Sequence, residues 1–286
     1  MIEIKNLNKS FGQKEVLSRI NCRLDNGIYG FLGKNGAGKT TLMRCLAGIY
    51  GDWNGEILVN GKPAGRKTVM AGYLPQSFGL FRELKVLDMM RYLASAKKIP
   101  KAGRDSEIMR CLRAVYMEER TGSRVGALSG GMVRRLGIAQ ALMGRPGILL
   151  FDEPTAGLDP EERMHFKNIL SGLGKEETVI VSTHIVEDIE ACCDAVIIID
   201  SGKILRVGTC KEIADTAAGR VYVCPKGEET NITQDYVMEK QFEKDGEICY
   251  RILSAATLPF VQVEPTLEDG YLCIQKMMDK KRIRGV

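Results

Sequence analysis

The chain has 286 residues, of which 44% are hydrophobic and 27% charged, and its formal net charge is +5 at pH 7. This length allows one large domain, or one domain with an appendage, and the composition is that of an ordinary globular protein. The small basic excess does not indicate nucleic-acid binding, so no nucleic-acid partner is expected. Only residues 276–284 are locally basic, which indicates a solvated terminus or, alternatively, contact with an anionic membrane surface.

No apolar run approaches the ~20 residues that span a bilayer, and residues 1–11 lack the apolar core of a signal peptide. We therefore expect a cytoplasmic protein, or one held at a membrane only through another protein. The nine cysteines form an odd set without zinc-binding or redox spacing, which favours free thiols.

The first part of the chain alternates between strand-like and helix-like segments. Strands are predicted at 2–7, 28–32, 56–59, 148–151, 178–182 and 195–199, and helices at 39–49, 131–143 and 161–173. The last three strands are continuously apolar, which is typical of parallel strands buried on both faces. The alternation predicts an α/β fold.

Two other regions depart from this pattern. Between about residues 77 and 145 the strand-like runs vanish, and helices predicted at 86–96 and 105–116 indicate a helical insertion. Farther on, short strands are predicted at 220–224, 248–253, 260–263 and 270–274. The sequence therefore predicts a main domain over 1–215 and a small α+β accessory domain over 216–286.

A glycine-rich segment between a short apolar strand and a helix matches the pattern G-x-x-x-x-G-K-[ST]. Its glycines let main-chain N–H groups point inward around an anion. Lys39 supplies positive charge for the β- and γ-phosphates, and the Thr40 hydroxyl can bind Mg²⁺. The residues of this loop expected to hold a nucleotide are Gly33, Lys34, Asn35, Gly36, Ala37, Gly38, Lys39, Thr40 and Thr41. The pattern alone does not separate kinases, GTPases and ATPases.

Two acids, Asp152 and Glu153, end the apolar run at 148–151. Buried carboxylates at a strand end are unfavourable unless they meet a cation; exposed acids are the alternative. In phosphate-loop enzymes the first such acid holds Mg²⁺, which assigns Asp152 to the metal and Glu153 to the attacking water. His184 follows the strand at 178–182, so we expect it at the same sheet edge, where it can stabilise charge on the γ-phosphate. A core or surface histidine without such a role is the alternative.

Ser129, Gly130 and Gly131 precede the helix predicted at 131–143. A hydroxyl group and free N–H groups at a helix start can bind an anion, or can simply cap the helix. With this segment, Leu128-Ser-Gly-Gly-Met132, the chain resembles the nucleotide-binding subunits of ABC transporters over roughly residues 1–215.

The resemblance implies further site residues. Phe11 takes the place of the aromatic residue that stacks on adenine, with Val16 beside it. Gln76 matches the glutamine that reaches Mg²⁺ and links to the transmembrane partner, and Asp159 ends the loop that crosses the dimer interface. Met132 departs from the glutamine that is common in the family. Methionine there, and the segment 265–269, resemble exporter-type ATPases of the drug- and antibiotic-resistance branch.

The resemblance also implies the fold and the activity. The fold is that of a phosphate-loop NTPase, the ABC cassette, with a mixed sheet core, and the activity is an Mg-dependent ATPase with ATP and Mg²⁺ as cofactors. It implies a dimer, expected to be a homodimer, in which Ser129–Gly131 of one subunit closes on the nucleotide of the other. A separate transmembrane permease of an exporter would hold the dimer at the inner face of the cell membrane.

Alternatives remain at this point. A soluble ABC ATPase of ribosomes, chromosomes or DNA repair is disfavoured by the single cassette and by the lack of heptads or zinc spacing. A degenerate cassette without turnover is disfavoured by Glu153 and His184. The insertion is expected to dock the permease near Gln76, where Phe78, Leu80 and Phe81 either form that surface or belong to the insertion's own core.

Overall fold

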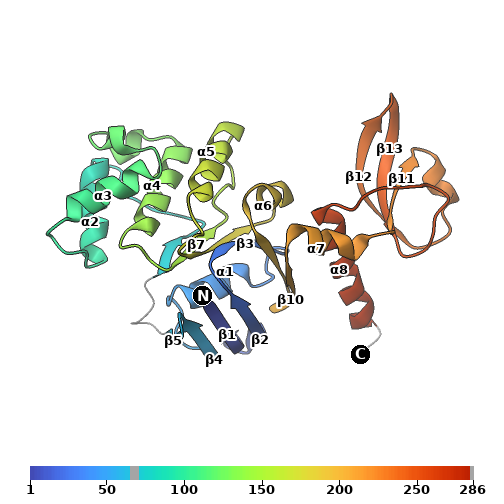
Figure 1. Cartoon of the computed structure of the whole chain (residues 1–286), viewed down its shortest axis with the longest axis horizontal. Helices are drawn as coiled ribbons and strands as arrows, with labels where there is room; N and C mark the ends of the chain where they lie inside the picture. The colour runs from blue at the N-terminus through green and yellow to red at the C-terminus, as the bar shows by residue number, and fades with distance from the viewer. Residues whose placement is uncertain (65–70, 284–286) are drawn as a thin grey trace. The chain divides into compact units, whose positions relative to one another are not determined.

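The computed structural model describes residues 1–64 and 71–283, with side chains described as far as residue 276. The chain divides into two compact units, 1–204 and 205–286 (Figure 1). This division falls before the predicted boundary at residue 215, and helix α7 (Cys210–Ala214) belongs to the second unit. Most of the basic segment 276–284 lies outside the described side chains. Among the described residues, no helix is both long and apolar enough to cross a bilayer. None of the nine cysteines forms a disulfide there.

Two sheets form the first unit. The larger sheet has the order β10-β9-β3-β8-β7-β6 and the smaller one the order β2-β1-β4-β5. The larger sheet consists of β3 (Gly27–Leu32), β6 (Ala71–Leu74), β7 (Ile148–Asp152), β8 (Thr178–Thr183), β9 (Ala195–Asp200) and β10 (Lys203–Gly208), and the division between the units falls within β10, after Ile204. The smaller sheet consists of β1 (Ile2–Phe11), β2 (Lys14–Leu24), β4 (Asn54–Val59) and β5 (Lys62–Pro63). The pairings among β3, β6, β7, β8 and β9 are parallel, whereas those of the smaller sheet are antiparallel. The predicted α/β fold with mixed sheets is confirmed.

Alternate residues of β7 enter two different hydrophobic cores. Ile148 and Leu150 pack with α1 (Lys39–Leu46) and the inner face of the smaller sheet, whereas Leu149 and Phe151 pack with helices on the opposite face. Those helices are α2 (Val86–Ala96), α3 (Arg104–Arg113), α4 (Gly130–Leu142) and α5 (Pro160–Ser171). Burial on both faces accounts for the continuously apolar strands.

The predicted helical insertion contains α2, α3 and all of α4, with short 3₁₀ turns at Glu118–Arg120 and Val125–Ala127 between α3 and α4. Of the three apolar residues left open above, Phe78 and Leu80 pack against the core of this region. Phe81 is 53% exposed, and its ring meets that of Tyr92 edge-on at 5.4 Å between centroids. The insertion therefore uses two of these side chains internally and presents the third on its surface.

The second unit is built on an antiparallel sheet of order β12-β13-β11-β14, with α7 and α8 (Leu267–Ile283). The strands are β11 (Val221–Pro225), β12 (Tyr236–Lys244), β13 (Glu247–Ser254) and β14 (Val261–Gln262). The predicted strand at 270–274 is wrong, because these residues lie in α8. The main-chain N–H of Thr266 donates to Asp269 Oδ2 at 2.7 Å, and Asp269 N–H donates to Thr266 Oγ1 at 3.4 Å. This reciprocal cap starts a helix.

Gly270 occupies a position in the first turns of α8 that leaves no room for a side chain. A Cβ atom at this position would lie 2.0 Å from the carbonyl oxygen of Ile213 and 2.9 Å from the Cα of Ala214. Helix α8 therefore approaches the main chain of α7 more closely than any side chain would allow.

Candidate functional site

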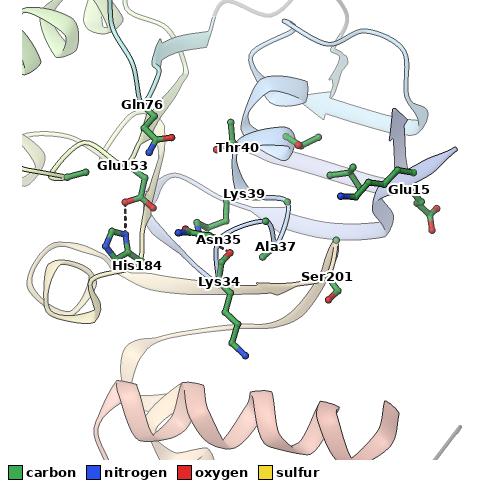
Figure 2. A pocket seen from close by; sticks show the side chains of 17 residues that line it. Glu15, Lys34, Asn35, Ala37, Lys39, Thr40, Gln76, Glu153, His184 and Ser201 are labelled. Carbon is green, nitrogen blue, oxygen red and sulfur yellow. Dashed lines mark hydrogen bonds and ion pairs between the residues drawn. The ribbon is translucent and has the colours of Figure 1, made fainter. Parts of the chain in front are cut away.

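A cleft of about 760 Å³ opens beside the carboxyl ends of the parallel strands (Figure 2). The predicted site residues that line it are Val16, Lys34, Asn35, Gly36, Ala37, Gly38, Lys39, Thr40, Thr41, Gln76, Glu153 and His184. It is also lined by Ala156, the first residue of the loop that ends at Asp159, and by Lys14, Glu15, Ser201 and Gly202, which were not predicted. Ser201 and Gly202 follow β9 directly, and this position at the end of a parallel strand is the feature of the sequence by which they could have been found.

The phosphate loop runs from the end of β3 to the start of α1, and two of its glycines are sterically required. A Cβ atom on Gly33 would lie 2.3 Å from the carbonyl oxygen of Ile199. Gly38 has φ +109°, a left-handed conformation that favours glycine, and it is the residue before α1. Because Gly38 has no side chain, the first N–H groups of α1 are left for an anion in the cleft.

Lys39 is folded onto the loop that precedes it. Its Nζ donates to the carbonyl oxygens of Gly33 at 2.5 Å and Lys34 at 3.3 Å, and the residue is only 7% exposed. Burial lowers the pKa of Lys39, while the charges of Glu153 and Asp152 oppose that shift. The ammonium group is thus held at the loop in the field of both acids.

Asp152 is buried, at 1% exposure, and is not among the residues that line the cleft. Its Oδ1 accepts a hydrogen bond from Ser182 Oγ at 2.6 Å, and its Oδ2 accepts one from the Tyr73 hydroxyl at 3.4 Å. The Thr40 hydroxyl and the Gln76 amide, which line the cleft, also carry oxygen atoms that can bind a metal ion. These residues fit Mg²⁺, which prefers hard oxygen ligands.

Glu153 and His184 meet inside the cleft: Glu153 Oε2 lies 2.9 Å from His184 Nδ1 (Figure 2). The Glu153 side chain is 10% exposed and that of His184 is 59% exposed. Glu153 has φ +49°, an unfavourable left-handed conformation for a residue with a side chain. Its N–H donates to Ser182 at two places, the carbonyl oxygen at 3.1 Å and Oγ at 3.0 Å.

Other predicted site residues do not line this cleft: Phe11, Gly33, Ser129, Gly130, Gly131, Asp152 and Asp159. Ser129 Oγ accepts the N–H of Met132 at 3.1 Å, so the serine does cap α4. Asp159 likewise caps α5 by accepting the N–H of Glu162 at 2.9 Å. Anion binding by the Ser129 segment stays a prediction.

Phe11 ends β1 and is 43% exposed. Its ring meets that of Tyr50 edge-on at 5.2 Å, and Lys9 Nζ lies 4.4 Å from the Phe11 ring centroid. Lys9 is 2% exposed and pairs with Asp52 Oδ2 at 2.7 Å. The aromatic ring is therefore fixed by a buried cation and a neighbouring ring, with part of its surface open.

Arg134 was not predicted, because no motif marks it. From α4 its Nη1 donates to the carbonyl oxygens of Pro75 at 3.2 Å and Gln76 at 2.8 Å, and its Nη2 donates to that of Glu153 at 3.1 Å. Burial lowers the pKa of Arg134, while Asp152 and Glu153 oppose the shift. A guanidinium group thus connects two segments of the site.

A phosphate loop between a parallel strand and a helix, facing an acid and a histidine across one cleft, defines a nucleotide-binding protein of the phosphate-loop class. The family model described as "ABC transporter" matches residues 17–156. The chain belongs to the ABC transporter family, among its ATP-binding proteins, and it carries that family's ATPase domain.

The relatives include two named for resistance and export. The linearmycin resistance ATP-binding protein LnrL of Bacillus subtilis is 32% identical over 225 residues, which cover 77% of this chain and 72% of that protein. The Nod factor export ATP-binding protein I of Rhizobium sp. (strain N33) is 31% identical, with 95% of each chain covered. A solved dimeric bacterial ABC transporter cassette, 23% identical, has a TM-score of 0.64 over 73% of this chain and 98% of that one, which shows the shared fold.

Proposed function

We propose that this chain hydrolyses Mg·ATP and so energises export through a separate transmembrane permease, at the inner face of the cell membrane. The observation that carries the proposal is the 2.9 Å contact between Glu153 Oε2 and His184 Nδ1, in the cleft lined by the phosphate loop. An acid of low exposure beside an exposed imidazole suits a base that takes a proton from water next to a group that faces the phosphate.

The roles follow from chemistry. Main-chain N–H groups of the loop and Lys39 bind the phosphates, and Thr41 supports the same segment. Glu153 accepts the proton of the attacking water, and His184 donates a hydrogen bond toward the γ-phosphate. Thr40, Gln76 and Asp152 would hold Mg²⁺, which when bound neutralises charge on the β- and γ-phosphates. Phe11 and Val16 are assigned to the adenine.

We assign the remaining residues to a second subunit's site. Ser129, Gly130, Gly131 and Asp159 do not line the cleft of their own chain, yet Ser129 and the two glycines open α4 with N–H groups suited to an anion. A protein of the same fold is dimeric. A homodimer in which each Ser129 segment covers the partner's nucleotide accounts for both facts.

The proposed permease contact is the exposed aromatic pair Phe81 and Tyr92 on the insertion. Exposed aromatic side chains next to each other are typical of interface anchors. The support for export as the direction is the naming of the two relatives for resistance and export.

The test is phosphate release from ATP by the purified full chain, with Mg²⁺ and with EDTA. We expect Mg-dependent turnover, and we expect Lys39→Ala to lose the ATP-dependent rise in melting temperature because binding itself is weakened. Turnover that is equal in EDTA would overturn the metal assignment. An unchanged ATP-dependent rise in Lys39→Ala would overturn the assignment of the loop.

A further inference from the structure

Arg134 is unusual in that one side chain serves three main-chain acceptors on two separate segments. Pro75 and Gln76 follow β6, and Glu153 follows β7, and the three carbonyl oxygens lie 2.8–3.2 Å from the Arg134 nitrogens. The planar guanidinium group has five N–H donors in fixed directions, so it can hold these acceptors at a set separation.

The main chain of Glu153 needs such support. With φ +49° it occupies a conformation that persists only where its surroundings fix it. Ser182 holds the N–H side of Glu153 and Arg134 holds the carbonyl side. The peptide groups on both sides of its Cα are thus bound, and the carboxylate is directed to His184.

Arg134 belongs to the same helix that Ser129 caps, one turn beyond its start. A second side chain of α4 contacts the same segment: Gln140 Nε2 donates to the Tyr73 carbonyl oxygen at 2.8 Å. A displacement of α4 therefore moves the donors that hold the chain around Gln76 and Glu153. The end of the helix assigned to the partner's nucleotide is thus connected to the water-activating group of its own chain.

We propose that Arg134 is a positioning residue that sets the separation of the Gln76 and Glu153 main chains and so aligns the metal-binding and water-activating side chains. The proposal rests on the proposed function, since it assigns a further residue to that reaction. Arg134 acts through Gln76 and Glu153 rather than on the nucleotide.

The test compares Arg134→Met, Arg134→Lys and the matched control Arg110→Met in the full chain. Arg110 also donates to a main-chain carbonyl of α4, that of Leu142 at 2.9 Å, but at the opposite end of the helix. Three quantities are measured: kcat for phosphate release, the Mg²⁺ concentration at half-maximal rate, and the Kd of ATP in EDTA. Without metal, the Kd reports the phosphate loop and the adenine contacts, none of which Arg134 is proposed to affect.

For Arg134→Met we expect kcat to fall by roughly 10- to 100-fold, because small misplacements of catalytic groups have effects of this size. We also expect a higher Mg²⁺ requirement and a Kd within about twofold of the original. Arg134→Lys keeps the charge but not the fork of donors, so it should recover only part of kcat. Arg110→Met should keep kcat even if it lowers the melting temperature.

A double variant separates positioning from packing. If Arg134 acts partly through Glu153, adding Arg134→Met to Glu153→Gln at saturating Mg²⁺ should lower the residual rate by a smaller factor than Arg134→Met lowers that of the original chain. A kcat of Arg134→Met near that of the original chain would overturn the inference, as would equal losses in Arg110→Met. A lack of turnover in the unaltered chain would instead refute the proposed function.

Discussion

The carboxylate of Glu153 and the imidazole of His184 form a single hydrogen-bonded unit, with Oε2 and Nδ1 2.9 Å apart. The acid is the inner partner, at 10% side-chain exposure, and the histidine is the outer one, at 59%. The register of the sheet sets this pair up, since Asp152 of β7 stands opposite Ser182 of β8. Glu153 follows Asp152 directly, and His184 comes two residues after Ser182, so the register brings the two side chains to the same sheet edge.

Replacing Glu153 by Gln keeps the side-chain shape but removes the base. We expect turnover to fall by about 10²- to 10⁴-fold while ATP binding is retained. ATP should then accumulate in a dimer, which size-exclusion chromatography with and without ATP would detect. Turnover near the original rate would mean that another group activates the water.

His184→Ala should lower kcat without affecting folding, because the side chain is largely exposed. We expect a loss of roughly 10²- to 10³-fold in phosphate release and a stability change within about 0.5 kcal/mol. His165, the other histidine of the chain, lies on α5 and supplies the matched control. If His165→Ala reduced kcat as much, the effect could not be attributed to the contact with Glu153.

Phe11→Ala tests the adenine assignment. Stacking of a base on an aromatic ring contributes about 1–3 kcal/mol, so we expect ATP to bind correspondingly more weakly. Inorganic tripolyphosphate has no base and should bind as before, which calorimetry with both ligands would show. Phe81→Ala removes another exposed phenylalanine and serves as the control. Equal losses for ATP and tripolyphosphate would show that Phe11 shapes the loop instead.

The second unit contains a buried cluster of two acids and one arginine. Arg251 pairs with Asp269 Oδ2 at 2.6 Å and with Glu239 Oε2 at 3.1 Å, and the side chains of the two acids are 0% and 1% exposed, respectively. Burial raises the pKa of Glu239 to about 8, with Asp269 and Glu268 adding to the shift. Burial opposes the shift of Asp269, but hydrogen bonds from Arg251 lower its pKa to about 2.

The raised pKa of Glu239 determines the direction in which the stability of the second unit changes with pH. Between the ordinary glutamate pKa of 4.5 and about 8, the folded chain keeps a proton that the unfolded chain has lost, so stability falls as pH rises through this range. Asp269 acts in the opposite sense only at lower pH, where stability falls as pH drops from 3.8 toward 2. We expect the melting temperature of the second unit to decrease from pH 5.5 to 8.5.

Glu239→Gln should remove that decrease and raise the melting temperature at pH 8.5, by ~4–8 °C for each kcal/mol gained in a unit of this size. Thermal unfolding of the full chain by calorimetry at several pH values would measure it. Glu243→Gln, an exposed acid on the same strand, should leave the slope as it was. A slope that persists in Glu239→Gln would place the responsible proton elsewhere.

Gly270→Ala should destabilise the second unit by about 1–3 kcal/mol, because the new methyl group would overlap the Ile213 carbonyl oxygen. Urea unfolding of the full chain would measure the loss. Gly122→Ala is the control, since no atom outside its immediate neighbours lies within 4 Å of a Cβ there. If both variants unfolded at the same urea concentration, the close approach of α7 and α8 would be wrong.

Local sequence determined what could be predicted. The phosphate loop requires glycines and a lysine at fixed spacing, and α2 at Val86–Ala96 follows its hydrophobic period, so both were found from the sequence. The segment 270–274 misled because a short apolar run suits a strand or a buried helix equally. The signal that distinguishes the two is the helix cap formed by Thr266 and Asp269. Strand β12 was missed because polar residues interrupt it: Glu239, Lys240 and Gln241 stand between its apolar residues, and Glu243 and Lys244 end it.

Contacts between segments that are far apart in the sequence could not be predicted from local patterns. Arg134 reaches Gln76 and Glu153 because α4 packs across β6 and β7, and Ser182 holds Asp152 through strand register. Neither relationship leaves a pattern within one segment of the sequence. The predicted role of Ser129 depends on a second molecule, about which one chain's sequence is silent apart from resemblance.

The position of β3 has a consequence for how the chain acquires its structure. This early strand lies between β8 and β9, with Gly27 opposite Thr178 and Tyr29 opposite Ala195. During synthesis, β3 therefore remains unpaired on both edges until β8 and β9, near the end of the first unit, have left the ribosome. Such long-range pairing slows folding and prolongs the exposure of strand edges to aggregation. The ligand can thus stabilise only a nearly finished domain and cannot serve as an early template for it.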